Sequence, residues 1–179
     1  MPGVVVVGSG IAGLFASLRC AEAGWDVRIV TKSDPRESST NWAQGGIAGI
    51  LDRTDGIGLE SHITDTLNSG AGHCDTEVVR SVVSEAGDRI RDLLSYGVEF
   101  DKSEAGIYDL AKEGGHSENR ILHTKDATGA EIERALLESV LNNPRISMHP
   151  NQLVVDLILK EYKSIEKDVV GLWCLDLEN

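Results

Sequence analysis

Hydrophobic residues near the start of the chain first follow the pattern of a buried strand and then that of a helix. Residues 4–7 are consecutive valines, which is typical of a strand covered on both faces of a parallel sheet. Residues 11–23 place apolar side chains at helical spacing, and Gly24 supplies a C-terminal stop. Residues 26–31 then return to a strand pattern. This order predicts a βαβ unit with a right-handed crossover.

The middle of the chain is predicted to contain a long loop followed by two helices. Residues 32–58 are rich in Ser, Thr, Gly and Asp and show no sustained period, and ordered loops of that length are usually functional. Helical spacing resumes over residues 61–68. A longer amphipathic helix then starts after Asp75 and ends at Gly97.

A further helix and several short strands are predicted in the rest of the chain. Thr128 and Glu131 form a capping box for a helix that ends before Pro144. Strands are predicted at residues 98–101, 107–110, 146–148, 152–160 and 168–177, the last three forming a C-terminal β-meander. The fold class is therefore α/β, a Rossmann-like domain with a parallel sheet. We expect the domain to be incomplete, because a doubly wound sheet needs further parallel strands.

Composition narrows the class of protein. The 179 residues include 17 Lys plus Arg and 29 Asp plus Glu, and the net charge of −12 argues against nucleic-acid binding. No apolar run approaches the roughly 20 residues that cross a bilayer, and no basic, apolar leader precedes residue 4, so we expect a cytoplasmic protein without a membrane partner. Cys20, Cys74 and Cys174 lack metal-ligand spacing, which indicates reduced thiols and no metal site.

A glycine-rich turn joins the first predicted strand to the first predicted helix. It reads Gly8-Ser9-Gly10-Ile11-Ala12-Gly13, the G-x-G-x-x-G fingerprint of dinucleotide-binding folds. In that fingerprint the first glycine permits the tight turn, the second lets the backbone approach a pyrophosphate, and the third allows close helix packing. Its place between strand and helix favours a cofactor site over a merely structural turn, with phosphates at the helix N-terminus.

The end of the second predicted strand lacks the acidic residue that usually holds a ribose. The sequence there is Thr31-Lys32-Ser33, which weakens the standard NAD interpretation. Thr31 or Ser33 could bond a ribose, and Lys32 could lie near a phosphate or could be a solvated loop lysine.

Two polar segments farther along carry further candidate chemistry. Residues 38–46 combine hydroxyls, a carboxamide and two glycines, which suit phosphates, ribityl oxygens and the edge of a heterocycle. A flexible loop is the alternative. Residues 112–117 and 120–129 bring two His, two Lys and one Arg into an acidic protein. They indicate either an anion site or a surface loop with balanced charges.

Taken together, these segments resemble one family. The fingerprint, SSTNWAQGGIAG, KEGGHS and RILHTKDATGAEIERALL are similar in order and spacing to the L-aspartate oxidases, flavoproteins of the succinate dehydrogenase and fumarate reductase superfamily. The resemblance covers nearly the whole chain, and the AQGG and EGGHS segments are far more specific than the fingerprint.

The resemblance implies FAD as the cofactor, with the hydroxyl and lysine pair Thr31 and Lys32 in place of the strand-end acid. The implied contacts beyond the fingerprint are Ser39, Thr40, Asn41, Trp42, Ala43, Gln44, Gly45 and Gly46 near the isoalloxazine and Val154 and Val155 near the adenine. The related succinate dehydrogenases carry a covalently linked histidine where this chain has Ser39. The resemblance therefore implies noncovalent FAD.

The implied reaction is hydride transfer from the α-carbon of L-aspartate to the flavin, giving iminoaspartate for quinolinate and NAD biosynthesis. Oxygen or fumarate would reoxidise the flavin, and quinolinate synthase would be a functional partner. Glu113 of the EGGHS segment is implied to orient the substrate through its α-ammonium group. A solvated glutamate paired with Lys112 is the alternative role for this residue.

Residues 1–179 are expected to be the N-terminal part of an FAD-binding domain, without the capping and C-terminal domains. The isolated chain is then expected to be inactive and to bind FAD weakly or not at all. Two alternatives stay open: a succinate dehydrogenase or fumarate reductase flavoprotein, and a short non-catalytic flavin-binding module.

Overall fold

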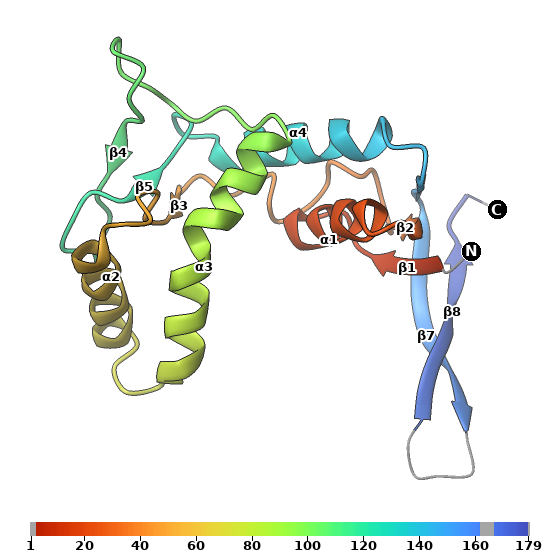
Figure 1. The fold of residues 1–179 in the computed structure, drawn as a ribbon. Helices are drawn as coiled ribbons and strands as arrows, with labels where there is room; N and C mark the ends of the chain where they lie inside the picture. Colours follow the sequence, from red (N-terminus) through yellow and green to blue (C-terminus); the bar gives the residue numbers. More distant parts are fainter. Residues whose placement is uncertain (1–2, 162–166, 179) are drawn as a thin grey trace. The chain divides into compact units, whose positions relative to one another are not determined.

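Helices and strands build two units in this computed structural model, which describes residues 3–161 and 167–178 (Figure 1). The first unit contains the described residues of Met1–Asn41 and Glu133–Asn179, and the second consists of Trp42–Ile132. In the described part of the chain, no helix is both long enough and apolar enough to span a bilayer.

The first unit is built on a parallel sheet of three strands. β1 (Gly3–Val7), β2 (Asp26–Val30) and β6 (Ile146–His149) lie in the order β1-β2-β6. α1 (Ile11–Glu22) connects β1 to β2 and packs against both strands (Figure 1). The strand, helix and strand predicted from the apolar pattern are thereby confirmed.

Burial across this sheet differs from the expectation for β1. The prediction that residues 4–7 are covered on both faces is wrong, because Val5 and Val7 are 42% and 56% exposed. β1 is one of the two outer strands, whereas β2 pairs on both sides and buries Val27 and Ile29. The valine run marked a strand correctly, but it did not reveal how many neighbours that strand has.

A long antiparallel ribbon, β7 (Gln152–Glu161) and β8 (Lys167–Asp176), follows in the same unit. It starts where the Gln152 N–H donates to the Thr31 carbonyl at 2.9 Å, just after β2. All three predicted C-terminal strands are present, but β6 joins the parallel sheet and leaves β7 and β8 as the antiparallel pair. Large apolar side chains are exposed along the ribbon, namely Leu153, Val155, Leu157, Leu159, Val169, Val170, Trp173 and Leu175.

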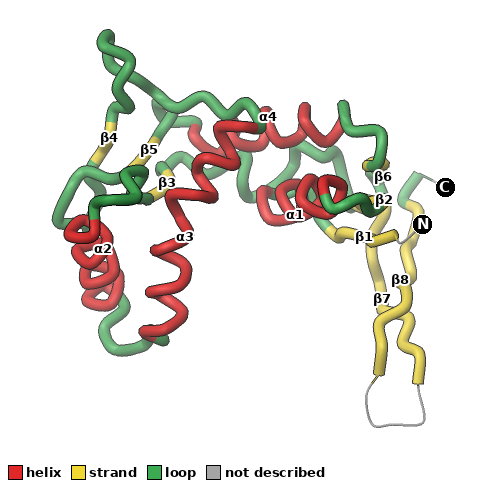
Figure 2. Tube along the Cα trace, viewed as in Figure 1, coloured by secondary structure: helices red, strands yellow, loops and turns green. Residues whose placement is uncertain are grey.

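The second unit contains two helices that pack side by side, α2 (Gly56–Ser69) and α3 (Thr76–Ser95), as Figure 2 shows. The Asp75 carboxylate accepts hydrogen bonds from the N–H groups of Glu77 and Val78 at 2.9 and 3.1 Å. These bonds satisfy N–H groups that have no partner within the helix. The predicted start of this helix is confirmed.

Three two-residue strands form a small antiparallel sheet in the second unit. β3 (Ile47–Ala48), β5 (Ile121–Leu122) and β4 (Leu110–Ala111) lie in the order β3-β5-β4. α4 (Thr128–Leu141) starts within one residue of its predicted position, but the predicted capping box is not formed. Thr128 Oγ1 accepts from the Thr124 N–H at 3.0 Å, and the Glu131 N–H donates to the Ala127 carbonyl at 3.1 Å.

Several boundaries predicted for this unit are wrong. β3 lies inside the loop predicted over residues 32–58, and α2 also starts within it. Residues 98–101 form no strand, because the alternation of Val98 and Phe100 reflects burial in the core and not sheet pairing. The strand predicted at residues 107–110 is reduced to β4, and the short β5 has no period that a sequence pattern could detect.

The apolar surface exposed on β1 and on the ribbon predicts that copies of the chain of residues 1–179, produced alone, associate with each other. Sedimentation velocity over a concentration series should show assemblies that grow with concentration. Replacing Val5 and Val7 by Thr should weaken association, whereas Thr at the exposed Val78 and Val82 of α3 should change it less. A chain that stays monomeric and unfolds cooperatively with high stability would contradict this prediction.

Candidate functional site

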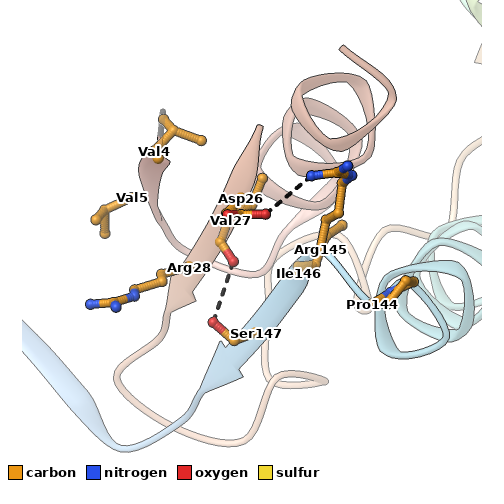
Figure 3. A pocket seen from close by; sticks show the side chains of 10 residues that line it. Val4, Val5, Asp26, Val27, Arg28, Pro144, Arg145, Ile146 and Ser147 are labelled. Carbon is orange, nitrogen blue, oxygen red and sulfur yellow. Dashed lines mark hydrogen bonds and ion pairs between the residues drawn. The ribbon is translucent and has the colours of Figure 1, made fainter. Parts of the chain in front are cut away.

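Two hollows of the first unit lie at opposite ends of the parallel strands. One, of about 600 Å³, lies at the strands' amino ends, where Arg145 pairs with Asp26 at 3.3 Å (Figure 3). The other, of about 400 Å³, lies at the carboxyl ends. Its lining consists of Val7, Gly8, Ser9, Gly10, Val30, Thr31, Lys32, Glu37, Ser38, Ser39, Thr40, Gln152, Leu153 and Val154. Open α/β sheets bind ligands at the carboxyl ends of their strands, so the second hollow is the candidate cofactor pocket.

The glycine turn at the floor of this pocket has the geometry that the fingerprint requires. Gly8 has a φ of 99°, a left-handed conformation that disfavours residues with a Cβ, and its N–H donates to the Val30 carbonyl at 2.8 Å. A Cβ at Gly13 would lie 2.1 Å from the Gly8 carbonyl oxygen, closer than atoms can approach. The helix can therefore start this close to the strand only with glycine at residue 13.

The N-terminus of α1 is capped by a residue far away in the sequence. The Ile11 N–H donates to Thr40 Oγ1 at 3.0 Å, and a Cβ on Gly10 would stand 3.3 Å from the same oxygen. The first turn of α1 contains no acidic side chain. Its positive end can therefore face a phosphate beside the loop that carries Ser39 and Thr40.

The strand-end residue Thr31 supports the turn rather than facing outward. Its Oγ1 is 3.2 Å from Ser9 Oγ, and both side chains are buried. Lys32 is exposed and lines the pocket, where its charge can meet an anionic ligand. Ser33 is not among the residues that line the pocket.

Glu133 is a buried residue next to this site that the sequence analysis did not single out. It is 1% exposed, accepts a short hydrogen bond from Ser38 Oγ through Oε2, and has no hydrogen-bond partner at Oε1 in the described structure. Burial raises the pKa of its carboxyl above the ordinary range, against the smaller opposing effects of Ser38 and the Asn41 N–H. A charged residue at helical spacing from Leu136 and Val140 was the available signal.

Only some of the residues predicted to contact the cofactor line the candidate pocket. Those that line the pocket are Gly8, Ser9, Gly10, Thr31, Lys32, Ser39, Thr40 and Val154. Those of the first unit that do not line it are Ile11, Ala12, Gly13, Asn41 and Val155, the last 58% exposed. Trp42, Ala43, Gln44, Gly45 and Gly46 belong to the second unit. Ser38, part of the polar segment 38–46, also lines the pocket. The sequence analysis did not select the remaining lining residues, Val7, Val30, Glu37, Gln152 and Leu153.

The second unit brings its two candidate loops together. A Cβ at Gly45 would lie 3.6 Å from Glu113 Oε1, so the carboxylate of the EGGHS segment lies against the backbone of the AQGG segment. Glu113 is exposed. The neighbouring Lys112 ammonium donates to the Ser117 carbonyl at 2.9 Å, which closes the loop on itself. The contact found for Lys112 is thus Ser117, and not the Glu113 partner of the alternative interpretation.

Arg120 and His123, two of the basic residues between residues 112 and 129, have separate acidic partners. Arg120 is 1% exposed and pairs with Asp65 at 2.6 Å, whereas His123 Nδ1 lies 3.3 Å from Asp101. They do not converge on one anion site. Burial, together with Arg120 and His116, lowers the pKa of His62, which lies in the same cluster.

Comparison with known proteins identifies the family to which this chain belongs. The sequence matches the family model described as FAD binding domain over residues 3–179. The chain belongs to the FAD-binding domain family. FAD is therefore its cofactor, and the glycine turn, the N-terminus of α1 and the exposed Lys32 fit a phosphate-containing ligand.

Individual relatives agree with the resemblance seen in the sequence. The chain is 50% identical over 153 residues to L-aspartate oxidase 2-b, chloroplastic, of Nicotiana tabacum, covering 86% of this chain and 23% of that protein. It is 42% identical over 183 residues to L-aspartate oxidase of Yersinia pestis, covering 98% of this chain and 34% of that protein. The Mycobacterium smegmatis Sdh1 complex in the apo form matches with a TM-score of 0.84 and 29% identity, over 97% of this chain and 31% of that one. This chain thus spans about a quarter to a third of the curated relatives, and its resemblance to the L-aspartate oxidases is confirmed.

We expect the complete protein to hold FAD without a covalent bond, because the Ser39 hydroxyl cannot form a histidyl link. Acid precipitation of the FAD-loaded full-length protein should leave the flavin in the supernatant. A succinate dehydrogenase flavoprotein treated in the same way is the control and should retain its flavin. Flavin that stays with the washed pellet of this protein would show that the prediction is wrong.

The Asp65 carboxylate should make stability depend on pH in acid. The Ser117 N–H, then Arg120 and the Ser117 hydroxyl, hold the pKa of Asp65 far below its usual range. The resulting stabilisation is fully present above about pH 4, the ordinary pKa of Asp, and is lost progressively as the pH falls further. Urea unfolding of full-length Asp65→Asn at several pH values should show a weaker acid loss than wild type. The exposed Asp109→Asn should keep the wild-type profile, and equal profiles for all three proteins would contradict the prediction.

Proposed function

We propose that residues 1–179 are the N-terminal part of the FAD-binding domain of an L-aspartate oxidase, whose capping and C-terminal domains lie outside this chain. The reaction is oxidation of L-aspartate to iminoaspartate, with oxygen or fumarate as the electron acceptor. The product feeds quinolinate synthase and NAD biosynthesis. We also propose a cytoplasmic location for this protein, although its plant relatives carry the word chloroplastic in their names.

The observation that carries this proposal is the position of Glu113. Its carboxylate lies against Gly45, which joins the EGGHS and AQGG segments in one place. The resemblance of the sequence to the L-aspartate oxidases depends chiefly on these two segments. An exposed carboxylate suits the α-ammonium group of aspartate, and the absence of a side chain at Gly45 leaves room beside it.

The chain's own residues supply binding and orientation. When bound, FAD supplies the acceptor for the hydride that leaves the α-carbon of aspartate. The Gly8 turn and the N-terminus of α1 would hold its phosphates, and Lys32 would add a positive charge. Thr40 holds the adjoining loop in place through the Ile11 N–H. Glu113 orients the substrate by accepting hydrogen bonds from its ammonium group.

A succinate dehydrogenase or fumarate reductase flavoprotein is the rival function. The likeness to the Mycobacterium smegmatis complex supports the shared fold, but its 29% identity is well below the 50% shared with the tobacco oxidase. Succinate has no ammonium group for Glu113 to bind. The reading frame downstream of residue 179 tests the remaining alternative, a short flavin-binding module, because a module would end there.

Replacing Glu113 by Gln should weaken aspartate recognition more than fumarate reduction. A charge-assisted hydrogen bond contributes about 1.5–3 kcal/mol, which corresponds to a loss of roughly ten- to a hundredfold in kcat/KM for aspartate oxidation. The measurement compares aspartate oxidation and fumarate reduction in the FAD-loaded full-length protein.

Glu104→Gln is the matched control, because Glu104 is also exposed and lies in a neighbouring loop. It should leave both activities unchanged. Equal losses in both reactions for Glu113→Gln would remove ammonium recognition as its role. A wild-type protein that does not oxidise aspartate would overturn the proposed function itself.

A further inference from the structure

Arg120 is the largest fully buried side chain of the described structure. Arginine is rarely buried unless it is paired, so its partners are informative. Its Nη1 donates to Asp65 at 2.6 Å, and its Nη2 donates to Ser61 Oγ at 3.0 Å. Both partners come from α2. Arg120 itself lies directly before β5, so this ion pair joins the helix to the small sheet.

The same carboxylate oxygen also holds the loop that carries Glu113. Asp65 Oδ2 accepts from the Ser117 N–H at 2.7 Å and from the Ser117 hydroxyl at 2.8 Å. The guanidinium thus orients Asp65, while Asp65 fixes the end of the EGGHS segment. The loop contains two adjacent glycines, one of which, Gly115, has a φ of 87°, so these bonds add restraint to a backbone that is otherwise held mainly by the Lys112–Ser117 bond within the loop.

Arg120 also determines the state of His116 in this loop. Its Nη1 lies 3.1 Å from His116 Nδ1. A guanidinium has no acceptor atom, so this contact favours the tautomer in which Nδ1 accepts the hydrogen bond and Nε2 carries the proton. The ring of His62, which is buried, lies behind His116 with 5.4 Å between the ring centroids. His116 and Ser117, at the C-terminal end of the segment 113–117, are therefore constrained from the protein side, and the His116 N–H donates to the Glu113 carbonyl at 3.2 Å.

We propose that the buried Arg120–Asp65 pair is a positioning device that holds the Glu113–Ser117 loop in the geometry needed to bind the substrate ammonium group. Arg120 does not touch the substrate, and its effect passes through Asp65, Ser117 and His116 to Glu113. The consequence for substrate recognition rests on the proposed function. The holding of the loop does not depend on it.

The first test measures whether the pair holds the loop. Hydrogen exchange of the FAD-loaded full-length protein should be faster in peptides covering residues 112–117 for Arg120→Lys and for the milder Ser117→Ala. Exchange in β1 and α1 should stay unchanged. Arg80→Lys is the matched control, because Arg80 also pairs with a carboxylate of α2, Glu60, at 2.5 Å but on the surface. Unchanged loop exchange in both test variants would overturn the proposal.

The second test measures whether the loop acts through Glu113. Arg120→Lys and Ser117→Ala should each raise the KM for aspartate, the former roughly tenfold, with a smaller change in kcat. In a Glu113→Gln background the same substitutions should have little further effect, because the group that they position is already lost. Losses that multiply in the double variants would show a general structural role and overturn the proposal.

The two tests separate the possible failures. If the wild-type protein does not oxidise aspartate, the proposed function fails while hydrogen exchange still decides whether Arg120 holds the loop. If aspartate oxidation is found but the double variants lose activity independently, the proposed function stands and the positioning role fails.

Discussion

The close approach of α1 to the turn after β1 is the constraint on which the first unit depends. A Cβ at Gly13 would overlap the Gly8 carbonyl oxygen at 2.1 Å, so the helix can start directly above the strand end only with glycine there. That approach sets the N-terminus of α1 at the edge of the pocket and brings Ile11 within reach of Thr40. The phosphate end of the pocket and the Ser39 loop are thereby joined, although they are far apart in the sequence.

Buried polar groups hold each candidate loop from the protein side. Thr31 bonds Ser9 beneath the glycine turn, and Glu133 bonds Ser38 beneath the loop that ends at Asn41. In the second unit Arg120 reaches the EGGHS segment through Asp65. Burying such groups carries a desolvation penalty, which hydrogen bonds must offset. These buried polar groups lie directly beneath exposed loops. The hydrogen bonds that offset their desolvation also fix the geometry of the loops, which a binding site requires.

The different roles of cofactor and protein in a flavoprotein explain why buried polar groups hold these loops. The cofactor carries the redox chemistry, so the protein chiefly has to bind it and orient the substrate. A pocket lined by the glycine turn, by Ser and Thr hydroxyls and by Lys32, together with Glu37 and several apolar side chains, suits a nucleotide cofactor such as FAD. In the proposed function, the exposed carboxylate of Glu113 would distinguish aspartate from succinate, which has the same length but no ammonium group. The specificity of that proposed reaction would then depend on how well the loop that carries Glu113 is held.

The sequence by itself determined the βαβ unit, the glycine turn, the long helices and the family, because these depend on short-range periodicity, on residues without a side chain and on specific motifs. Only the tertiary structure showed that β1 is an outer strand, that β6 belongs to the parallel sheet, and that residues 98–101 form no strand. Strand neighbours and two-residue ladders are set by contacts between distant segments, which leave no local period. The same reason explains why Glu133 and the Arg120–Asp65 pair could not be assigned from sequence. Whether a charged residue is buried, and which partner neutralises it, is decided by packing across 55 or more positions of the chain.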